Sequence, residues 1–177
     1  MKVPAFHEEW FSDASQAVLA HLVQAVADVP GVLVEFGSWE GRSTCAMARA
    51  AYPRQVLAVD TWEGSPGEIS AELAAKRDVF AQFLANVTHW TRGNVSPQRM
   101  GWREFMAANT EPIALAFIDA EHTYREVYDN ITAVLPFVPS GGIICGDDAH
   151  HPPVIEAVSE LLPGWQQDAA LWIWRAP

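Results

Sequence analysis

The stretch Val32-Leu33-Val34-Glu35-Phe36-Gly37-Ser38-Trp39-Glu40-Gly41-Arg42-Ser43 decides the fold that we predict for this chain. An apolar run that stops at Glu35 is typical of a buried strand, and a glycine-bearing turn and a helical run follow it. Strand, loop and helix in this order predict a parallel α/β sheet, in which ligands bind beyond the carboxyl ends of the strands. Glycine lets the backbone approach a ligand, and the N–H groups of a helix N-terminus attract an anion. We therefore expect this stretch to be the central strand and the floor of a small-molecule site.

The loop after this strand differs from the common phosphate-binding loops. Gly37 and Gly41 are separated by three residues, so G-x-G-x-x-G is absent, and no Gly-Lys-Ser/Thr follows. An acid at the strand end disfavours a pyrophosphate and favours a ligand that carries an ammonium group or hydroxyls. An ordinary βα turn, in which glycine only relieves crowding, stays open as the alternative.

The bulk composition predicts one domain that spans residues 1–177. Half of the residues are apolar, which is enough for a substantial core. The 22 acidic residues outnumber the 11 basic ones, and this argues against a nucleic-acid partner. No apolar run is long enough to span a membrane, and the N-terminus does not resemble a signal peptide. Cys45 and Cys145 lie in apolar runs, as expected for buried thiols in the cytoplasm, and the sequence is compatible with an oligomer.

Alternating strands and helices predict an α/β fold with a single doubly wound, mostly parallel seven-stranded sheet. Continuous apolar runs fit strands that are covered on both faces. A C-terminal antiparallel hairpin is expected at 166–169 and 171–175. The other expected strands are 32–36, 55–60, 89–92, 113–118 and 142–145, and the expected helices are 12–29, 44–51, 69–87, 97–109, 124–138 and 154–162.

Acidic residues follow four of these strands directly. Because the carboxyl ends of parallel strands share one edge of a sheet, we expect these acids to meet at one site. Asp60 is placed to accept hydrogen bonds from ribose hydroxyls, or else it caps nearby backbone N–H groups. Trp62 is placed to pack on an adenine, or else it is a core or rim aromatic. The four positions are Glu35, Asp60, Asp119 and Asp147–Asp148.

Four segments of the chain resemble the class I S-adenosylmethionine-dependent methyltransferases, which have a Rossmann-like fold. Within that family, the chain is most similar to the metal-dependent O-methyltransferases of macrolide and aminocoumarin sugars and to the cephalosporin hydroxylase-like branch. The resemblance covers residues from about 32 to 148, and its last two segments are the specific ones. The segments are Glu35–Ser43, Asp60–Gly64, Phe117–Tyr124 and Gly141–Asp148.

The resemblance implies a set of cofactor-binding residues. Glu35, Gly37, Ser38, Gly41 and Ser43 would surround the methionine part of S-adenosylmethionine. Asp60 would hold the ribose, and Thr61 and Trp62 would lie beside it. Gly93 and Asn94 fall where the family has Gly-Asp near the adenine, and the asparagine departs from that pattern.

The resemblance also implies a metal site and a base. Asp119, Asp147 and Asp148 supply the oxygen ligands that Mg²⁺ (or Mn²⁺) prefers, and they leave positions for the vicinal hydroxyls of a substrate. His122 lies three residues after Asp119, which is where catechol O-methyltransferase has its base; otherwise it is a surface or hydrogen-bonding histidine. His150 and His151 are expected to be ordinary loop histidines, and contact with the substrate or the metal is the alternative. For Asp147 and Asp148, the alternative is a solvated turn, or a capping role of Asp148 for the following segment.

We therefore predict an enzyme that transfers a methyl group from S-adenosylmethionine to a hydroxyl of a small polyhydroxylated molecule. Two alternatives stay open: a nicotinamide-dependent oxidoreductase on a similar fold, and a cofactor-binding module without catalysis. The chain is shorter than the sugar enzymes that it resembles, so little remains for an N-terminal lid.

Overall fold

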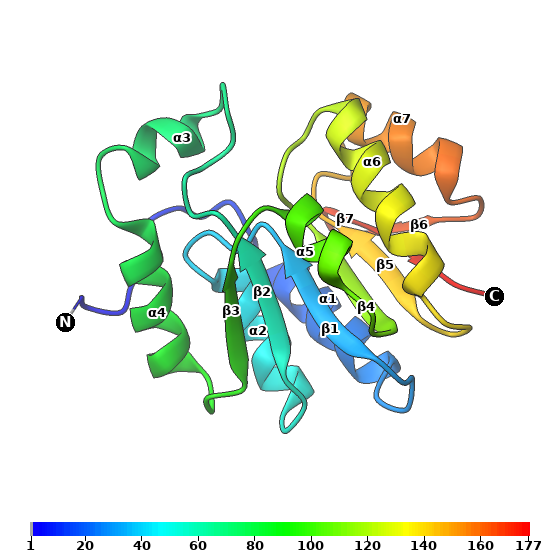
Figure 1. The fold of residues 1–177 in the computed structure, drawn as a ribbon, viewed down its shortest axis with the longest axis horizontal. Coiled ribbons are helices and arrows are strands. Elements are labelled where there is room, and N and C mark those ends of the chain that lie inside the picture. The colour runs from blue at the N-terminus through cyan, green and yellow to red at the C-terminus, as the bar shows by residue number, and fades with distance from the viewer. Residues whose placement is uncertain (1) are drawn as a thin grey trace.

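The computed structural model describes residues 2–177 and places a seven-stranded sheet between two layers of helices (Figure 1). The strand order is β3-β2-β1-β4-β5-β7-β6, in which the first five strands are parallel and β7 is antiparallel to both of its neighbours. The strands are β1 (Val32–Phe36), β2 (Val56–Asp60), β3 (Val95–Arg99), β4 (Ile113–Ile118), β5 (Ile143–Gly146), β6 (Gln166–Asp168) and β7 (Leu171–Arg175). The predicted α/β class, the mostly parallel sheet and the C-terminal hairpin are confirmed.

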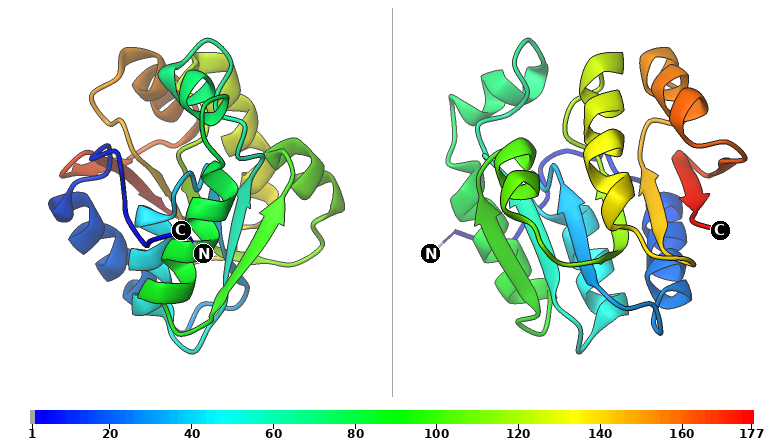
Figure 2. Two further views of the ribbon diagram at one scale, coloured as in Figure 1. Left: turned by 90° about the vertical axis from the view of Figure 1, so that its left-hand side faces the viewer. Right: turned by 45° about the vertical axis from the view of Figure 1, so that its right-hand side comes forward.

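Two groups of helices bury the two faces of the sheet, as Figure 2 shows from two further sides. Leu19 and Val23 of α1 pack with Met47 of α2 on one face, and Ile131 of α6 packs with Val158 of α7 on the other. This cover explains the apolar runs, because all six residues of β4 are buried. The helices are α1 (Asp13–Ala25), α2 (Arg42–Ala51), α3 (Ile69–Ala74), α4 (Val79–Trp90), α5 (Trp102–Ala108), α6 (Tyr124–Val134) and α7 (Pro152–Leu161), with a 3₁₀ turn at Leu135–Phe137.

The predictions for residues 69 to 109 were wrong in three places. The helix expected over 97–109 begins only at Trp102, because residues 97–99 belong to β3. The helix expected over 69–87 is two helices, because α3 ends at Ala74 and Asp78 caps a new helix by accepting the Ala81 N–H. The strand expected at 89–92 is the end of α4 and a turn, and β3 begins only at Val95. Since β3 is an edge strand with half-buried residues and Pro97 at its centre, it lacks the apolar run that marks the inner strands.

The order of the strands reverses between β1 and β4, because β2 lies on one side of β1 and β4 on the other. A doubly wound sheet places its ligand cleft at the carboxyl ends of the strands at this point. Among the described residues, no helix combines the length and the apolar character that crossing a membrane requires.

Candidate active site

A cavity of about 660 Å³ lies at the carboxyl edge of the sheet. Its wall is formed by the loops that follow β1, β2, β3, β4 and β5 and by part of the segment before α1. The predicted residues Gly37, Ser38, Ser43, Asp60 and Thr61 line it. The predicted Asp119, His122, Asp147 and Asp148 line it as well. One cavity therefore joins the predicted cofactor loop to the predicted metal group.

The loop after β1 is fixed in place by backbone contacts with its neighbours. The N–H of Gly37 donates to the carbonyl of Val59 at 3.0 Å, and the N–H of Asp119 donates to the carbonyl of Phe36 at 2.8 Å. Gly37 has φ +90°, and a Cβ there would lie 2.1 Å from the carbonyl oxygen of Asp119. Gly41, with φ +84°, caps α2. Both glycines are thus required by the backbone, and the N-terminus of α2 is held towards the cavity.

Glu35 does not reach the cavity, which corrects the prediction that it contacts the methionine part of the cofactor. Its side chain is fully buried, and Oε2 accepts hydrogen bonds from the hydroxyls of Ser38, at 2.7 Å, and Thr44. Oε1 is buried without a partner. Burial raises the pKa of Glu35 to about 7, and the negative charge of Asp119 adds to this effect. Glu35 therefore stabilises the loop after β1 from the protein interior, through its hydrogen bonds with Ser38 and Thr44.

The Asp60 carboxylate accepts three backbone hydrogen bonds. Oδ2 accepts the N–H groups of Ser38 and Trp39, both at 2.8 Å, and Oδ1 accepts the N–H of Trp62 at 2.6 Å. Burial raises its pKa, and these N–H groups oppose that shift. These contacts match the loop-capping alternative. A ribose contact stays a prediction, because the carboxylate lines the cavity and has acceptor capacity left on Oδ1.

Trp62 is a core residue, so the prediction that it packs on an adenine was wrong. It is only 4% exposed, and its ring lies 4.6 Å from that of Phe80 and 4.8 Å from that of Phe83, measured between centroids. Its Nε1 donates to the carbonyl of Trp39 at 2.8 Å. Trp62 has φ +58°, a local backbone conformation that the sequence did not reveal.

Gly93 and Asn94 lie at the opposite edge of the sheet from the cavity. They precede β3, whose first residue Val95 pairs with Val56 at the start of β2. The Asn94 amide donates to the carbonyls of Ala48 and Arg54 and supports that edge. The prediction that they contact the adenine was therefore wrong. The carboxyl end of β3 leads instead to Met100, Gly101 and Trp102, which line the cavity and which we had not predicted as site residues.

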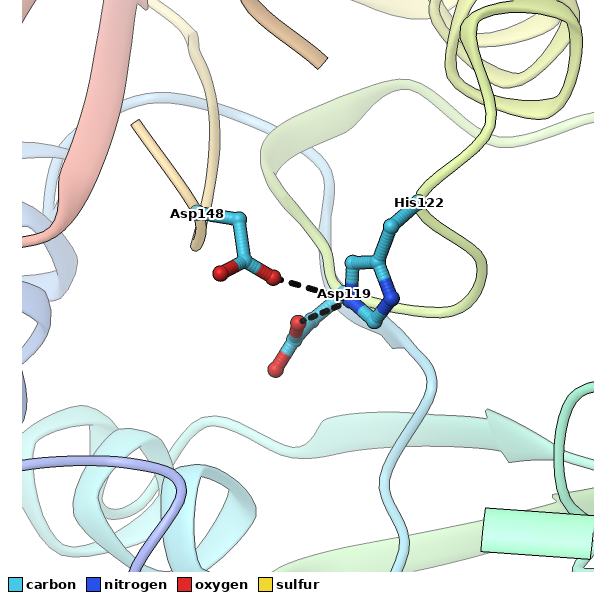
Figure 3. A group of neighbouring side chains, drawn as sticks. All are labelled: Asp119, His122 and Asp148. Carbon is cyan, nitrogen blue, oxygen red and sulfur yellow. Dashed lines mark ion pairs between the residues drawn. The ribbon is translucent and has the colours of Figure 1, made fainter. Parts of the chain in front are cut away.

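Asp119, His122 and Asp148 form one group, drawn in Figure 3. His122 Nε2 lies 3.0 Å from Asp148 Oδ2 and 3.7 Å from Asp119 Oδ1. Its Nδ1 lies 3.1 Å from Glu68 Oε1. The group is built from three loops, since Asp119 and His122 follow β4, Asp148 follows β5 and Glu68 caps α3. One ligand atom from each of Asp119, His122 and Asp148 lies within 4.8 Å of the other two, so these residues are close enough together to hold one metal ion.

The charges of this group shift each other's pKa values. The carboxylates of Asp119 and Asp148 raise the pKa of His122 to about 11, so the imidazole is protonated in this arrangement. The same contact lowers the pKa of Asp148. Burial and then Asp119 raise the pKa of Asp147 to about 7. In this structure, the imidazolium itself balances the negative charge of the carboxylates.

Asp147 lies beside this group rather than in it, although we predicted it as a metal ligand. It lines the cavity, and its Oδ1 is buried without a hydrogen-bond partner. A buried carboxylate oxygen without a partner is costly unless a ligand satisfies it. His150 is exposed, with Nε2 3.6 Å from Asp148 Oδ1, and the His151 ring lies 6.3 Å from the His122 ring.

The segment before α1 contributes a wall that sequence reasoning missed. Phe6, Glu8 and Trp10 line the cavity. The Glu8 carboxylate accepts the Trp39 Nε1–H at 3.0 Å and pairs with Arg77, and the Trp10 ring lies 5.5 Å from the Trp39 ring. No apolar periodicity or glycine turn marks these residues in the sequence, so only their contacts reveal the role.

Comparison with known proteins agrees with this geometry. A family model described as a methyltransferase domain matches residues 34–149. No curated protein matches the chain.

Solved structures share the fold, although their sequences are distant. The O-methyltransferase NovP is 21% identical over 91% of this chain and 78% of its own, with a TM-score of 0.71. CalS11, a TDP-rhamnose 3'-O-methyltransferase of calicheamicin biosynthesis, is 20% identical over 93% of this chain and 81% of its own, with a TM-score of 0.64. An O-methyltransferase from Bacillus cereus, solved in complex with SAH, is 19% identical over 93% and 81%, with a TM-score of 0.59.

Proposed function

The chain belongs to the methyltransferase-domain family, and from this premise we propose that it is a metal-dependent O-methyltransferase. The methyl donor is S-adenosylmethionine, and the acceptor is a hydroxyl of a small polyhydroxylated molecule. The observation that carries the proposal is the single cavity that joins the loop after β1 to the group of Asp119, His122 and Asp148. The fold neighbours that act as O-methyltransferases support the choice of oxygen as the acceptor atom.

The cofactor would lie along the loops after β1 and β2. The N-terminus of α2 faces this part of the cavity and offers free backbone N–H groups, which suit the carboxylate of the methionine moiety. S-adenosylmethionine supplies the electrophilic methyl group. The cavity-lining residues that we assign to its site are Gly37, Ser38, Ser43, Asp60 and Thr61, with Met100 and Trp102 in place of Trp62, Gly93 and Asn94 on the adenine side. Gly41 does not line the cavity and acts through its place at the start of α2.

The metal would be held by Asp119, Asp147 and Asp148. Carboxylate oxygens are the ligands that Mg²⁺ and Mn²⁺ prefer. The Oδ1 atom of Asp147 has no hydrogen-bond partner, so it is available as a metal ligand in addition to the carboxylates of Asp119 and Asp148. A bound dication lowers the pKa of an acceptor hydroxyl and orients it. Its charge would also replace the imidazolium as the partner of Asp119 and Asp148.

His122 would accept the proton that the acceptor hydroxyl loses. In the structure its Nε2 points to Asp148, so it can act as a base only after that contact is released and the ring is neutral. Glu68 remains beside Nδ1 and would keep the ring oriented while Nε2 faces the cavity.

The replacement His122→Ala tests this proposal. We expect the rate of methyl transfer to fall by about 10²–10⁴-fold. The affinity for SAH should stay nearly unchanged, and Mg²⁺ should bind at least as tightly, because the competing imidazolium is gone. His21→Ala, on the exposed side of α1, is the matched control and should keep the wild-type rate. If His122→Ala retains most of the activity, His122 is not the base. If neither S-adenosylmethionine nor SAH raises the melting temperature of the wild type, the assignment of the cofactor is wrong.

We further propose that residues 1–177 act as one domain and that the protein works in the cytoplasm. One sheet with its two helical layers accounts for the described residues, which supports the first statement. Cys45 and Cys145 are buried and free, which agrees with the second.

A further inference from the structure

The segment before α1 forms a wall of the cavity, although it contains neither a helix nor a strand in the described residues 2–12. It runs beside α4 (Figure 1), and two polar side chains of that helix, Gln82 and Asn86, donate hydrogen bonds to its backbone. Both side chains are buried, and neither of them lines the cavity. The position of this wall is therefore set by residues outside the cavity.

Asn86 is fully buried, and its side-chain amide uses all of its hydrogen-bonding capacity. Its Oδ1 accepts the Ala5 N–H at 2.8 Å and a hydrogen bond from Gln82 Nε2 at 3.2 Å. Its Nδ2 donates to the carbonyls of Ala5 and Glu40, both at 2.8 Å. Ala5 belongs to the segment before α1, and Glu40 belongs to the loop after β1. One side chain of α4 therefore joins two walls of the cavity.

The same two walls are also joined directly through the buried carboxylate of Glu40. Its Oε2 accepts the His7 N–H at 2.8 Å, and its Oε1 lies 2.8 Å from His7 Nδ1. Arg77, which lies between α3 and α4, pairs with both Glu40 and Glu8. Because a buried carboxylate needs partners, Glu40 would lose stabilising contacts if the segment before α1 moved away.

The loop after β1 packs closely on α4 beside these hydrogen bonds. A Cβ at Gly41 would lie 2.9 Å from Cδ2 of Phe83, which is itself fully buried in α4. Gln82, on the same helix, donates to the carbonyls of Val3 and Ala5 at 2.8 and 3.1 Å. Close packing of this kind leaves little room for the loop to move independently of the helix.

On the basis of the cofactor site proposed above, we propose that Asn86 is a positioning residue of that site. Its hydrogen bonds fix the segment before α1 and the loop after β1 relative to each other, so that both walls are in place before the cofactor binds. Walls that are already ordered lose less conformational entropy on binding, and this raises the affinity. Asn86 thus contributes to cofactor affinity without touching the cofactor.

Asn86→Ala and Asn94→Ala form a matched pair for the test. Asn94 is also buried, and its Nδ2 also donates to two backbone carbonyls, but it lies at the opposite edge of the sheet from the cavity. Both replacements remove buried hydrogen bonds, so both should lower the melting temperature. In calorimetry with SAH, at a temperature where both variants are folded, Asn86→Ala should raise the Kd by about tenfold or more, and Asn94→Ala should stay within about twofold of the wild type.

Amide hydrogen exchange tests whether the effect passes through the segment before α1. Asn86→Ala should speed exchange at the N–H groups of Ala5 and His7 by about tenfold or more, because it removes the acceptor of the first and loosens Glu40, the acceptor of the second. Asn94→Ala should leave both rates unchanged. The Mg²⁺ affinity should stay within about twofold in both variants, since the predicted metal group is built from other loops.

Gln82→Met is a second variant, which decides the question if Asn86→Ala does not fold. Methionine keeps a side chain of similar length, but it cannot donate to the carbonyls of Val3 and Ala5. This variant should raise the Kd of SAH by about threefold or more, because Asn86 still holds Glu40 while the segment before α1 is less firmly held.

A wild-type SAH affinity in Asn86→Ala, or in Gln82→Met if the first variant is unfolded, would overturn the inference. An equal loss of affinity in Asn94→Ala would overturn it too, because the loss would then follow from general destabilisation. Unchanged amide exchange at Ala5 and His7 would have the same consequence. If the wild type binds SAH in these experiments, only the role of Asn86 was inferred wrongly. If the wild type does not bind SAH, the proposed function fails, and this inference fails with it.

Discussion

Replacement of Glu35 by glutamine should flatten the dependence of stability on pH. Burial raises the pKa of this carboxyl from 4.5 to about 7 in the folded protein, whereas the unfolded chain keeps the ordinary value. The folded state therefore binds the proton more tightly, and deprotonation costs stability as the pH rises. The cost is absent below the unfolded pKa, grows between the two values and is complete above about pH 7. One pKa unit corresponds to about 1.4 kcal/mol, so the complete cost is about 3 kcal/mol.

Urea unfolding of the metal-free protein at about pH 5 and about pH 8 measures this cost. Between these values the wild type should lose about 2–3 kcal/mol more of its free energy of unfolding than Glu35→Gln loses. Glutamine keeps a carbonyl oxygen to accept the hydroxyls of Ser38 and Thr44, so the variant is expected to fold. The exposed Glu111→Gln should follow the wild type. If Glu35→Gln also loses stability in parallel with the wild type, Glu35 is not the buried titrating group.

Two further replacements test the roles of Trp62 and Asp147. Trp62→Phe should lower the free energy of unfolding by about 1–2 kcal/mol, because the buried carbonyl of Trp39 loses its hydrogen bond. The affinity of this variant for SAH, measured by calorimetry, should stay within about twofold of the wild type. A large loss of affinity without loss of stability would instead place Trp62 against the adenine. Mg²⁺ should bind more tightly as the pH rises through the pKa of Asp147, which is about 7. Asp147→Asn should weaken Mg²⁺ binding. Equal Mg²⁺ affinities of the wild type and this variant in calorimetric titrations would remove Asp147 from the metal site.

The inner strands could be predicted from the sequence because both of their faces are covered. Residues 113–118 form an unbroken apolar run, and the structure buries every one of them in β4. The edge strand β3 lacks such a run, since one side of it has no neighbouring strand and its residues are half-buried. Placing that strand too early in the chain also moved Gly93 and Asn94 to the wrong edge of the sheet. An error of a few residues in one strand therefore became an error about the site.

The sequence alone could not show which way the side chains in the loops point. A tryptophan after a strand-end acid can face a ligand or the core, and residue types do not distinguish the two. At Trp62 the positive φ and the contacts with Phe80 and Phe83 turn the ring inwards. The same holds for the segment before α1, where Glu8 and Trp10 are placed by their contacts with Trp39 rather than by any local pattern.

The strand-end acids were predicted as one set, and the structure divides them by the partners of their oxygens. Glu35 is enclosed by hydroxyls from its own loop and helix, and Asp60 accepts backbone N–H groups, so both stabilise the floor of the cavity. Asp147 has a buried oxygen without a partner, and Asp119 and Asp148 share one imidazole. Buried carboxylates that lack enough donors within the protein need an external cation or donor, because desolvation is costly without one. Glu35 also keeps one buried oxygen without a partner, but its side chain does not line the cavity, so no external cation can reach it there. Asp119, Asp147 and Asp148 do line the cavity, and they are therefore the acids to assign to the metal.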